Sequence, residues 1–269
     1  MSALPERLFP LTRDPGHSAL LLDFDGTLSA IVGDPEAARP QPGVSALLAR
    51  LAGQFSLVAV VSGRPVRFLA HVLGPPAGVR VIGLYGLEAL APDGTVRVID
   101  EAAPWEMVVA EVARLAATQA PVGVLVEPKG MTLTLHWRHA PRAQGWVEAF
   151  AAGQVAAHGL VSTSARMSIE LGPPLRVDKG TVARSLTEGA DFHAVAVFGD
   201  DLGDLPAFAA ASAEHVIRVA AVDEESPPEV AAQADLTVNG AAGAVALLQL
   251  LADTVESGDL AASGGGAGG

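Results

Sequence analysis

Short hydrophobic runs alternate with amphipathic segments along most of the chain. The runs are bounded by Gly, Pro or Asp, a pattern typical of strands buried on both faces, and lie at residues 19–24, 56–61, 79–84, 194–198 and 215–219. Helical periodicity predicts helices at residues 43–53, 65–73, 179–188 and 205–211. This alternation indicates an α/β fold with a doubly wound, mostly parallel sheet.

The pattern changes between residues 101 and 172. A helix is predicted at 101–119, strands at 122–126 and 131–137, a helix at 142–158 and a strand at 166–171. This order suits a small α+β unit with a largely antiparallel sheet. We therefore predict a core formed by residues 1–100 and 173–255, with an α+β domain inserted at 101–172. The Gly- and Ala-rich stretch 256–269 has no apolar periodicity and is predicted to be a flexible tail.

Composition and charge narrow the class of partner. Half of the 269 residues are hydrophobic and 17% are charged, which favours a compact globular protein. The net charge of −13 disfavours nucleic acid, although a metal and a few cations can still create a local anion site. The absence of cysteine excludes disulfides, thiolate metal sites and thiol nucleophiles.

The N-terminal segment has charges and prolines where a signal peptide needs a continuous apolar core. No later apolar run approaches the roughly 18 residues of a membrane span. We expect a cytoplasmic protein without a membrane partner, and the oligomeric state stays open.

Two aspartates follow the first predicted strand, in the run LLLDFDGTL at residues 20–28. Ligands of open α/β sheets bind at the carboxyl edge of the strands, where this run ends. In an extended chain Asp23 and Asp25 point to the same side. An isolated Asp-x-Asp pair also suits a turn or a helix cap, but the apolar strand before it and the Gly turn after it favour a reactive site.

A second acidic run, GDDLGD at residues 199–204, follows the strand predicted at 194–198. Asp200, Asp201 and Asp204 repel one another unless a cation neutralises them. Carboxylate oxygens of this kind suit Mg²⁺. The alternative is a solvated acidic loop that caps the following helix.

Two further polar residues stand at the ends of predicted elements. Ser62, in VVSGRP, opens onto a Gly turn, and Lys179, in VDKG, begins a predicted helix. A hydroxyl and an ammonium at such places can bind phosphate oxygens. Taken singly, both residues are equally well explained as helix caps or surface residues.

The order DFDGT, VSGR, DKG, GDDLGD resembles the four motifs of the haloacid dehalogenase (HAD) superfamily. Within it the chain is most similar to the trehalose-6-phosphate phosphatases, from residues 23–40, from GLYGLE at 83–88, from VEPKGMTLTLHWR at 126–138 and from IELGPPLRVDKG at 169–180. The resemblance implies a HAD-like core, an inserted cap domain and Mg²⁺-dependent hydrolysis of a sugar phosphate, trehalose 6-phosphate.

The resemblance also implies roles for individual residues. Asp23 would attack phosphorus, and Asp25 would protonate the departing sugar oxygen and later activate water. Mg²⁺ would be held by the Asp23 carboxylate, the Asp25 backbone carbonyl and the Asp200 carboxylate. The remaining motif residues would support this centre: Asp201 and Asp204 by holding metal-bound waters or neighbouring cations, and Ser62 and Lys179 by binding the phosphoryl oxygens.

Residues outside the four motifs are predicted to bind the substrate. Within the inserted unit these are Glu127, Lys129, Arg138 and Glu170, and in the core loops they are Arg64 and Glu88. A disaccharide offers many hydroxyls, which such polar side chains can bind. A charged, solvated sheet face is the alternative explanation for the residues of the insertion.

Three positions depart from the family pattern: Gly203, Leu205 and Tyr85 replace a threonine, a glutamate and a histidine. Sucrose phosphate or glucosylglycerol phosphate is therefore an alternative substrate. A noncatalytic metabolite-binding protein with a HAD-like fold is a further alternative. The retained pair Asp23 and Asp25, with Lys179 and Asp200, argues against it, because a binder needs no nucleophile and acid together.

Overall fold

The computed structural model describes residues 3–74, 77–165, 167–224 and 226–264. The chain forms two compact units, the first from Met1–Thr95 and Val177–Gly269 and the second from Val96–Arg176. The boundaries lie within about five residues of those predicted from the sequence.

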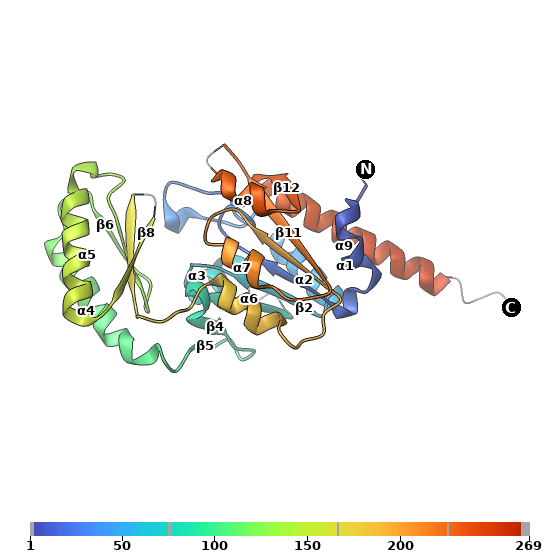
Figure 1. Cartoon of the computed structure of the whole chain (residues 1–269), viewed down its shortest axis with the longest axis horizontal. Coiled ribbons are helices and arrows are strands. Elements are labelled where there is room, and N and C mark those ends of the chain that lie inside the picture. The colour runs from blue at the N-terminus through green and yellow to red at the C-terminus, as the bar shows by residue number, and fades with distance from the viewer. Residues whose placement is uncertain (1–2, 75–76, 166, 225, 265–269) are drawn as a thin grey trace. The chain divides into compact units, whose positions relative to one another are not determined.

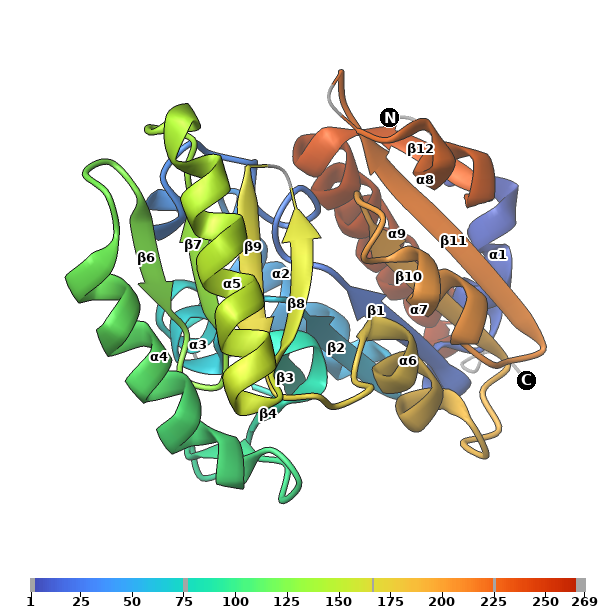
Figure 2. The same ribbon diagram turned by 60° about the vertical axis from the view of Figure 1, so that its left-hand side comes forward.

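The first unit of the chain (Figure 1) contains a sheet whose strands lie in the order β12-β11-β10-β1-β2-β3-β4, as labelled in Figure 2. All neighbours from β12 to β3 are parallel, and β4 pairs antiparallel with β3. The strands are β1 (Ser18–Leu22), β2 (Leu57–Val61), β3 (Val79–Gly83), β4 (Glu88–Leu90), β10 (Ala194–Gly199), β11 (His215–Val222) and β12 (Leu236–Asn239).

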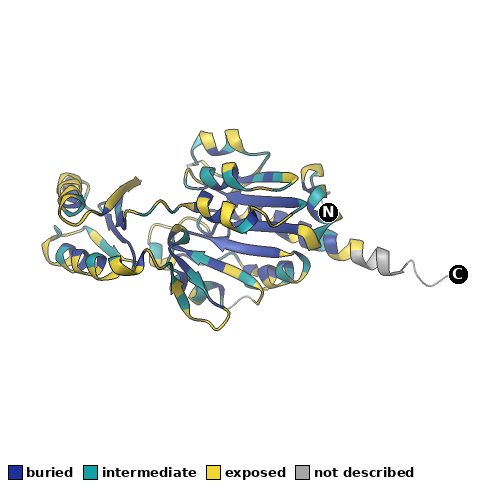
Figure 3. Cartoon of the chain, turned by 60° about the horizontal axis from the view of Figure 1, so that its bottom comes forward, coloured by how far each residue is buried: buried dark blue, intermediate teal, exposed yellow. Residues whose placement is uncertain are grey.

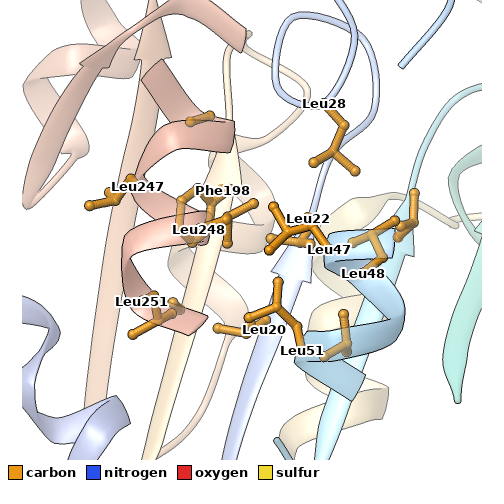
Figure 4. Close-up of a cluster of buried hydrophobic side chains, with 14 of the residues drawn as sticks. Leu20, Leu22, Leu28, Leu47, Leu48, Leu51, Phe198, Leu247, Leu248 and Leu251 are labelled. Atoms are coloured by element: carbon orange, nitrogen blue, oxygen red, sulfur yellow. The ribbon is translucent and has the colours of Figure 1, made fainter. Parts of the chain in front are cut away.

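Helices cover both faces of this sheet. One face packs on α1 (Phe9–Arg13), α2 (Val44–Gln54), α3 (Val66–Leu73) and α9 (Gly240–Gly264), and the other on α6 (Lys179–Thr187), α7 (Leu205–Ala210) and α8 (Pro228–Gln233). The strand residues alternate between the faces, so Leu20 and Leu22 lie among the leucines of α2 and α9 (Figure 4), whereas Ala19 and Leu21 belong to the opposite layer. The central strands are buried along their whole length (Figure 3).

The second unit has its own core. Its antiparallel sheet has the order β6-β7-β9-β8, with β6 at Leu125–Pro128, β7 at Leu133–His136, β8 at Val161–Ala165 and β9 at Ser168–Gly172. Two helices, α4 (Glu106–Gln119) and α5 (Gln144–His158), cover one face (Figure 2). The residues that alternate with the apolar ones, among them Glu127, Thr134 and Glu170, occupy the other face.

Short elements complete the description: β5 (Val96–Val98) and the 3-10 turns at Glu6–Leu8, Pro15–His17, Pro35–Ala37, Leu84–Gly86, Ala103–Trp105 and Pro141–Ala143. Among the described residues, no helix is both long and apolar enough to cross a membrane.

The structure corrects several sequence predictions. The strand predicted at 122–126 begins only at Leu125, because residues 121–124 form a turn with Gly123 at a φ of +90°. The polar run at Val161–Ala165 is a strand, β8, that hydrophobic periodicity did not indicate. The strand predicted at 166–171 is β9, from Ser168 onward, and its first predicted residue lies outside the described residues. Finally, α9 continues to Gly264, where a flexible tail from residue 256 was expected.

Local helix propensity does not account for the extension of α9, because residues 257–264 include two glycines, which disfavour a helix, beside two alanines, which favour one. The segment also lacks the apolar periodicity on which the prediction relied.

Candidate active site

Asp23 is the first residue after β1, at the carboxyl edge of the parallel sheet. Its backbone N–H donates to the Phe198 carbonyl of β10 at 3.0 Å, which extends the pairing of the two strands by one residue. The Asp23 side chain is 5% exposed. The sheet therefore holds this carboxylate in a fixed, largely desolvated position.

The acidic run follows β10, the neighbour of β1, and Asp204 organises it. One oxygen of Asp204 accepts the backbone N–H groups of Asp200 and Asp201 at 3.0 and 3.2 Å. Asp201 accepts the N–H of Gly203 at 2.8 Å. A Cβ on Gly199 would lie 2.2 Å from the Asp204 carboxyl carbon, so only glycine fits there.

Lys179 joins the two acidic segments. It is the first residue of α6, and its Nζ donates to Asp23 Oδ1 and to Asp204 Oδ1, both at 2.6 Å. All three side chains are buried. Burial alone would lower the pKa of Lys179, but the carboxylates of Asp204 and Asp23 outweigh it and raise the pKa well above its usual range. The ammonium group is therefore held in its charged form.

The carboxylates carry more negative charge than Lys179 neutralises. Burial raises the pKa of Asp23 to about 8, and Lys179 limits that increase. Burial raises the pKa of Asp200 to about 10, and the nearby Asp23 and Asp204 add to the shift. The carboxylate of Asp200 accepts no hydrogen bond from any residue that the structure describes.

Oxygen atoms of Asp23, Asp200 and Asp204 lie within 4.8 Å of one another. Both oxygens of Asp204 already accept hydrogen bonds, so Asp23 and Asp200 are the better ligands. The donor set consists of hard carboxylate oxygens, which suits Mg²⁺. A Cβ on Gly26, whose φ is +76°, would lie 2.0 Å from Asp200 Oδ2. The absence of a side chain at residue 26 thus leaves room for the Asp200 carboxylate.

Asp25 is half-buried and pairs with Arg64 from the loop after β2. The Arg64 Nε donates to Asp25 Oδ2 at 2.7 Å and Nη2 donates to Oδ1 at 2.9 Å. The guanidinium also donates to the Pro35 carbonyl at 2.9 Å and lies 4.7 Å from the centre of the Phe68 ring. Arg64, predicted to bind substrate, is thus positioned to orient the Asp25 carboxylate.

The loop that carries Ser62 and Arg64 is supported by residues 84–86. The Ser62 hydroxyl accepts the Arg64 N–H at 3.1 Å, and the backbone N–H of Leu84 and Tyr85 donate to the carbonyls of Arg64 and Ser62, both at 3.0 Å. Tyr85 has a φ of +60°, a left-handed conformation that non-glycine residues rarely adopt. A Cβ at residue 63 would lie 2.6 Å from the Tyr85 side chain, so the glycine leaves room for this ring.

Glu88 lies in β4 and is buried. Its Oε2 accepts the backbone N–H of Val66, the first residue of α3, at 2.9 Å. A carboxylate at this end of a helix is favourable because the first N–H groups lack partners. The structure thus gives Glu88, predicted to bind substrate, a contact that stabilises the start of α3.

The second unit gathers three predicted residues on the polar face of its sheet. Lys129 Nζ lies 3.0 Å from Glu170 Oε2 and 3.8 Å from Glu127 Oε2. Arg138 is exposed just after β7 and makes no contact in this cluster. The three clustered side chains are 12–17% exposed, so they remain accessible to a polar ligand.

Sequence reasoning missed two members of this cluster. Thr134 donates its hydroxyl to Glu170 Oε2 at 3.0 Å, and His136 Nε2 lies 2.8 Å from Glu127 Oε2. Both residues belong to the run LTLHW, in which every second side chain points to the same face. Pairing that alternation with the neighbouring predicted strand would have identified them.

Comparison with known families supports the reading of these motifs. The family model described as trehalose-phosphatase matches residues 21–240, which include both acidic runs and the inserted unit. The chain belongs to the trehalose-phosphatase family. This family is part of the HAD superfamily, so the doubly wound core and the α+β insertion are those of a HAD-like protein.

Relatives of this trehalose-phosphatase family member include the trehalose-phosphate phosphatase of Mycobacterium avium. It is 36% identical over an alignment 273 positions long, which covers 96% of this chain and 69% of the relative. The protein of that name from Mycobacterium ulcerans is 38% identical over an alignment 225 positions long, which covers 77% of this chain and 56% of the relative.

Two solved structures share the fold. A trehalose-6-phosphate phosphatase related protein has a TM-score of 0.74 at 19% identity, with 90% of this chain and 99% of that chain covered. The C-terminal domain of the Candida albicans trehalose-6-phosphate phosphatase has a TM-score of 0.70 at 21% identity, with 94% and 98% covered.

Proposed function

We propose that this chain hydrolyses trehalose 6-phosphate to trehalose and inorganic phosphate through an aspartyl phosphate on Asp23. The observation that carries the proposal is the buried Asp23 carboxylate, which lies 2.6 Å from the Lys179 ammonium at the edge of the sheet. A desolvated carboxylate beside a fixed cation suits attack on an anionic phosphate, since the cation offsets the repulsion between the two anions.

The reaction has two steps. In the first, a carboxylate oxygen of Asp23 forms a bond to phosphorus while the bond from phosphorus to the sugar oxygen breaks, and Asp25 gives a proton to that oxygen. In the second, a water oxygen bonds to phosphorus, its proton passes to Asp25, and the bond to Asp23 breaks. Lys179 and Ser62 bind the phosphoryl oxygens in both steps.

Asp25 acts only when one of its oxygens is available to the substrate. Because both oxygens accept hydrogen bonds from Arg64, substrate binding has to break or share at least one of these bonds. Arg64 thus positions Asp25 and does not itself transfer the proton.

The proposed cofactor is Mg²⁺, held by the carboxylates of Asp23 and Asp200 and by the backbone carbonyl of Asp25. Bound there, it would supply positive charge to the phosphate oxygens. The crowded, raised-pKa carboxylates of Asp23 and Asp200 support this assignment, because a divalent cation removes their mutual repulsion.

Phosphate release from trehalose 6-phosphate, with Mg²⁺ and with a chelator, tests the proposal. We expect Mg²⁺-dependent release that exceeds release from sucrose phosphate and glucosylglycerol phosphate. Faster release from one of those two substrates would refute trehalose 6-phosphate as the substrate and leave the aspartyl-phosphate mechanism in place. A protein that bound the sugar phosphate without releasing phosphate would be the noncatalytic alternative and would refute the proposal.

The polar cluster of the second unit is the proposed recognition surface for the sugar. Truncating Glu127, Lys129 or Glu170 to Ala should lower kcat/KM for trehalose 6-phosphate by about 10- to 150-fold, since each charge-assisted hydrogen bond contributes about 1.5–3 kcal/mol. Hydrolysis of para-nitrophenyl phosphate, which lacks the sugar, should change little. Glu111→Ala, on the exposed surface of α4, is the control. Equal losses on both substrates would show that the cluster supports folding instead.

A further inference from the structure

A second group of potential metal ligands lies at the opposite edge of the core sheet. His193 directly precedes β10, and Glu214 and His215 stand at the start of β11, its parallel neighbour. The catalytic carboxylates follow the other ends of the strands. Since β10 spans six residues at about 3.3 Å each, roughly 20 Å separates the two groups.

The side chains of this group converge. Glu214 Oε2 lies 3.0 Å from His193 Nδ1, and Glu214 Oε1 lies 3.7 Å from His215 Nε2. The two imidazole rings are 5.0 Å apart and nearly perpendicular, at 84°. One ligand atom from each of the three residues lies within 4.8 Å of the others.

The backbone holds these residues in place. The N–H of His193 donates to the carbonyl of His17 at 2.8 Å, and the N–H of His215 donates to the carbonyl of His193 at 3.0 Å. The three residues therefore lie at the starts of two paired strands, so little conformational freedom is lost when they bind an ion. His193 is the least exposed of the three side chains at 27%, so an ion can reach all of them from solvent.

We propose that His193, Glu214 and His215 form a Zn²⁺ site, separate from the phosphatase centre. Two imidazoles and one carboxylate are a common zinc ligand set, with water in the fourth position. Zinc–nitrogen distances near 2.0–2.1 Å place tetrahedral ligand atoms about 3.4 Å apart. The hydrogen-bonded pair Glu214 Oε2 and His193 Nδ1 is 3.0 Å apart, and one ligand atom from each of the three residues lies within 4.8 Å of the others, so small side-chain adjustments bring them to that spacing. The nitrogen ligands distinguish this site from the all-oxygen centre at Asp23 and Asp200, which suits Mg²⁺.

Calorimetric titration of the full chain with Zn²⁺, in excess Mg²⁺, tests the site. We expect wild type and His71→Gln to bind one ion with the same affinity, because His71 is exposed on α3 in the same unit. His193→Gln and His215→Gln should bind it at least about tenfold more weakly. Zn²⁺ should raise the Tm of wild type and of His71→Gln, but not that of the two site variants.

Several outcomes would overturn the proposal. One is the absence of Zn²⁺ binding to wild type, and another is equal affinity in all variants, which would place the ion at the acidic centre. A third is loss of binding in His17→Gln with retention in His215→Gln, which would place the ion at the nearby His17. Melting without metal shows whether each variant is folded. Mg²⁺-dependent phosphate release by His215→Gln should stay at the wild-type level, so failure of the zinc site and failure of the proposed phosphatase activity are distinguishable.

Discussion

Replacing Lys179 by methionine removes the one ammonium that contacts both Asp23 and Asp204 and keeps a side chain of similar length. Each contact is 2.6 Å long. At a pH above about 8, where Asp23 is ionised despite its raised pKa, two unit charges at that distance attract by about 6 kcal/mol at an effective dielectric constant of 20. Desolvation of the ammonium offsets much of this attraction. Removing one partner from a buried pair typically costs about 3–5 kcal/mol, and we expect a loss of that size in the free energy of unfolding.

Arg50→Met is the matched control. Arg50 also contacts two carboxylates, those of Asp253 and Glu256, but it does so at the surface, where the three side chains are 29–60% exposed. Solvent-exposed ion pairs contribute about 0–1 kcal/mol. Comparing the two variants therefore separates the effect of burial from the effect of losing a cation with two partners.

Urea unfolding without metal measures both variants. All three tryptophans of the sequence, at positions 105, 137 and 146, lie in the second unit, so their fluorescence follows that unit and far-UV circular dichroism follows the whole chain. Because Lys179 lies in the first unit, Lys179→Met should move the unfolding of that unit, seen by circular dichroism, to a lower urea concentration. The fluorescence transition of the second unit should stay unchanged. A loss below about 1 kcal/mol, equal to that of Arg50→Met, would refute the buried ion pair as an important source of stability.

Three further substitutions test the catalytic assignments. Asp23→Asn should abolish phosphate release without changing the circular dichroism spectrum, because an amide cannot form the acyl phosphate; substantial remaining turnover would exclude Asp23 as nucleophile. Asp25→Asn should lower kcat by about 10²- to 10⁴-fold with an unchanged Mg²⁺ requirement, whereas full activity at high Mg²⁺ would indicate that its carboxylate binds the metal. Gly26→Ala should cost about 1–2 kcal/mol of stability because residue 26 has a positive φ. It should also reduce phosphate release more than tenfold, because the added Cβ displaces Asp200. Gly33→Ala is the control: no atom lies within 4 Å of its added Cβ, so stability and phosphate release should be near wild type.

The central strands and the candidate site could be predicted from local sequence because their signals are local. The strands before Asp23 and Asp200 are buried on both faces, so all of their residues except Ser18 at the start of β1 are apolar. Parallel pairing of β1 with β10 then brings the two acidic segments together, although 177 positions separate Asp23 from Asp200. The carboxyl-edge rule placed the first run at the binding edge of the sheet, and the resemblance to the four HAD motifs predicted that both runs form one centre.

The parts that were missed depend on contacts between distant residues. Arg64 meets Asp25 across 39 positions, and Glu88 meets Val66 across 22, without any local pattern that announces either pair. The strand β8 is largely polar and is fixed by its pairing with β9. Such pairings are decided by tertiary structure, which outweighs the weak propensity of short polar segments.

The position of β1 in the middle of the sheet also bears on motion. Its residues pair with β10 on one side and with β2 on the other, and all five are buried. Amide hydrogens of such a strand exchange with solvent mainly through global unfolding. The nucleophile that follows β1 is thus attached to one of the slowest-opening segments of the unit, while Asp25 depends on a side-chain contact with a loop. Rearrangements during turnover should accordingly be found in the surroundings of Asp25 and Arg64, with the backbone at Asp23 as the stationary reference.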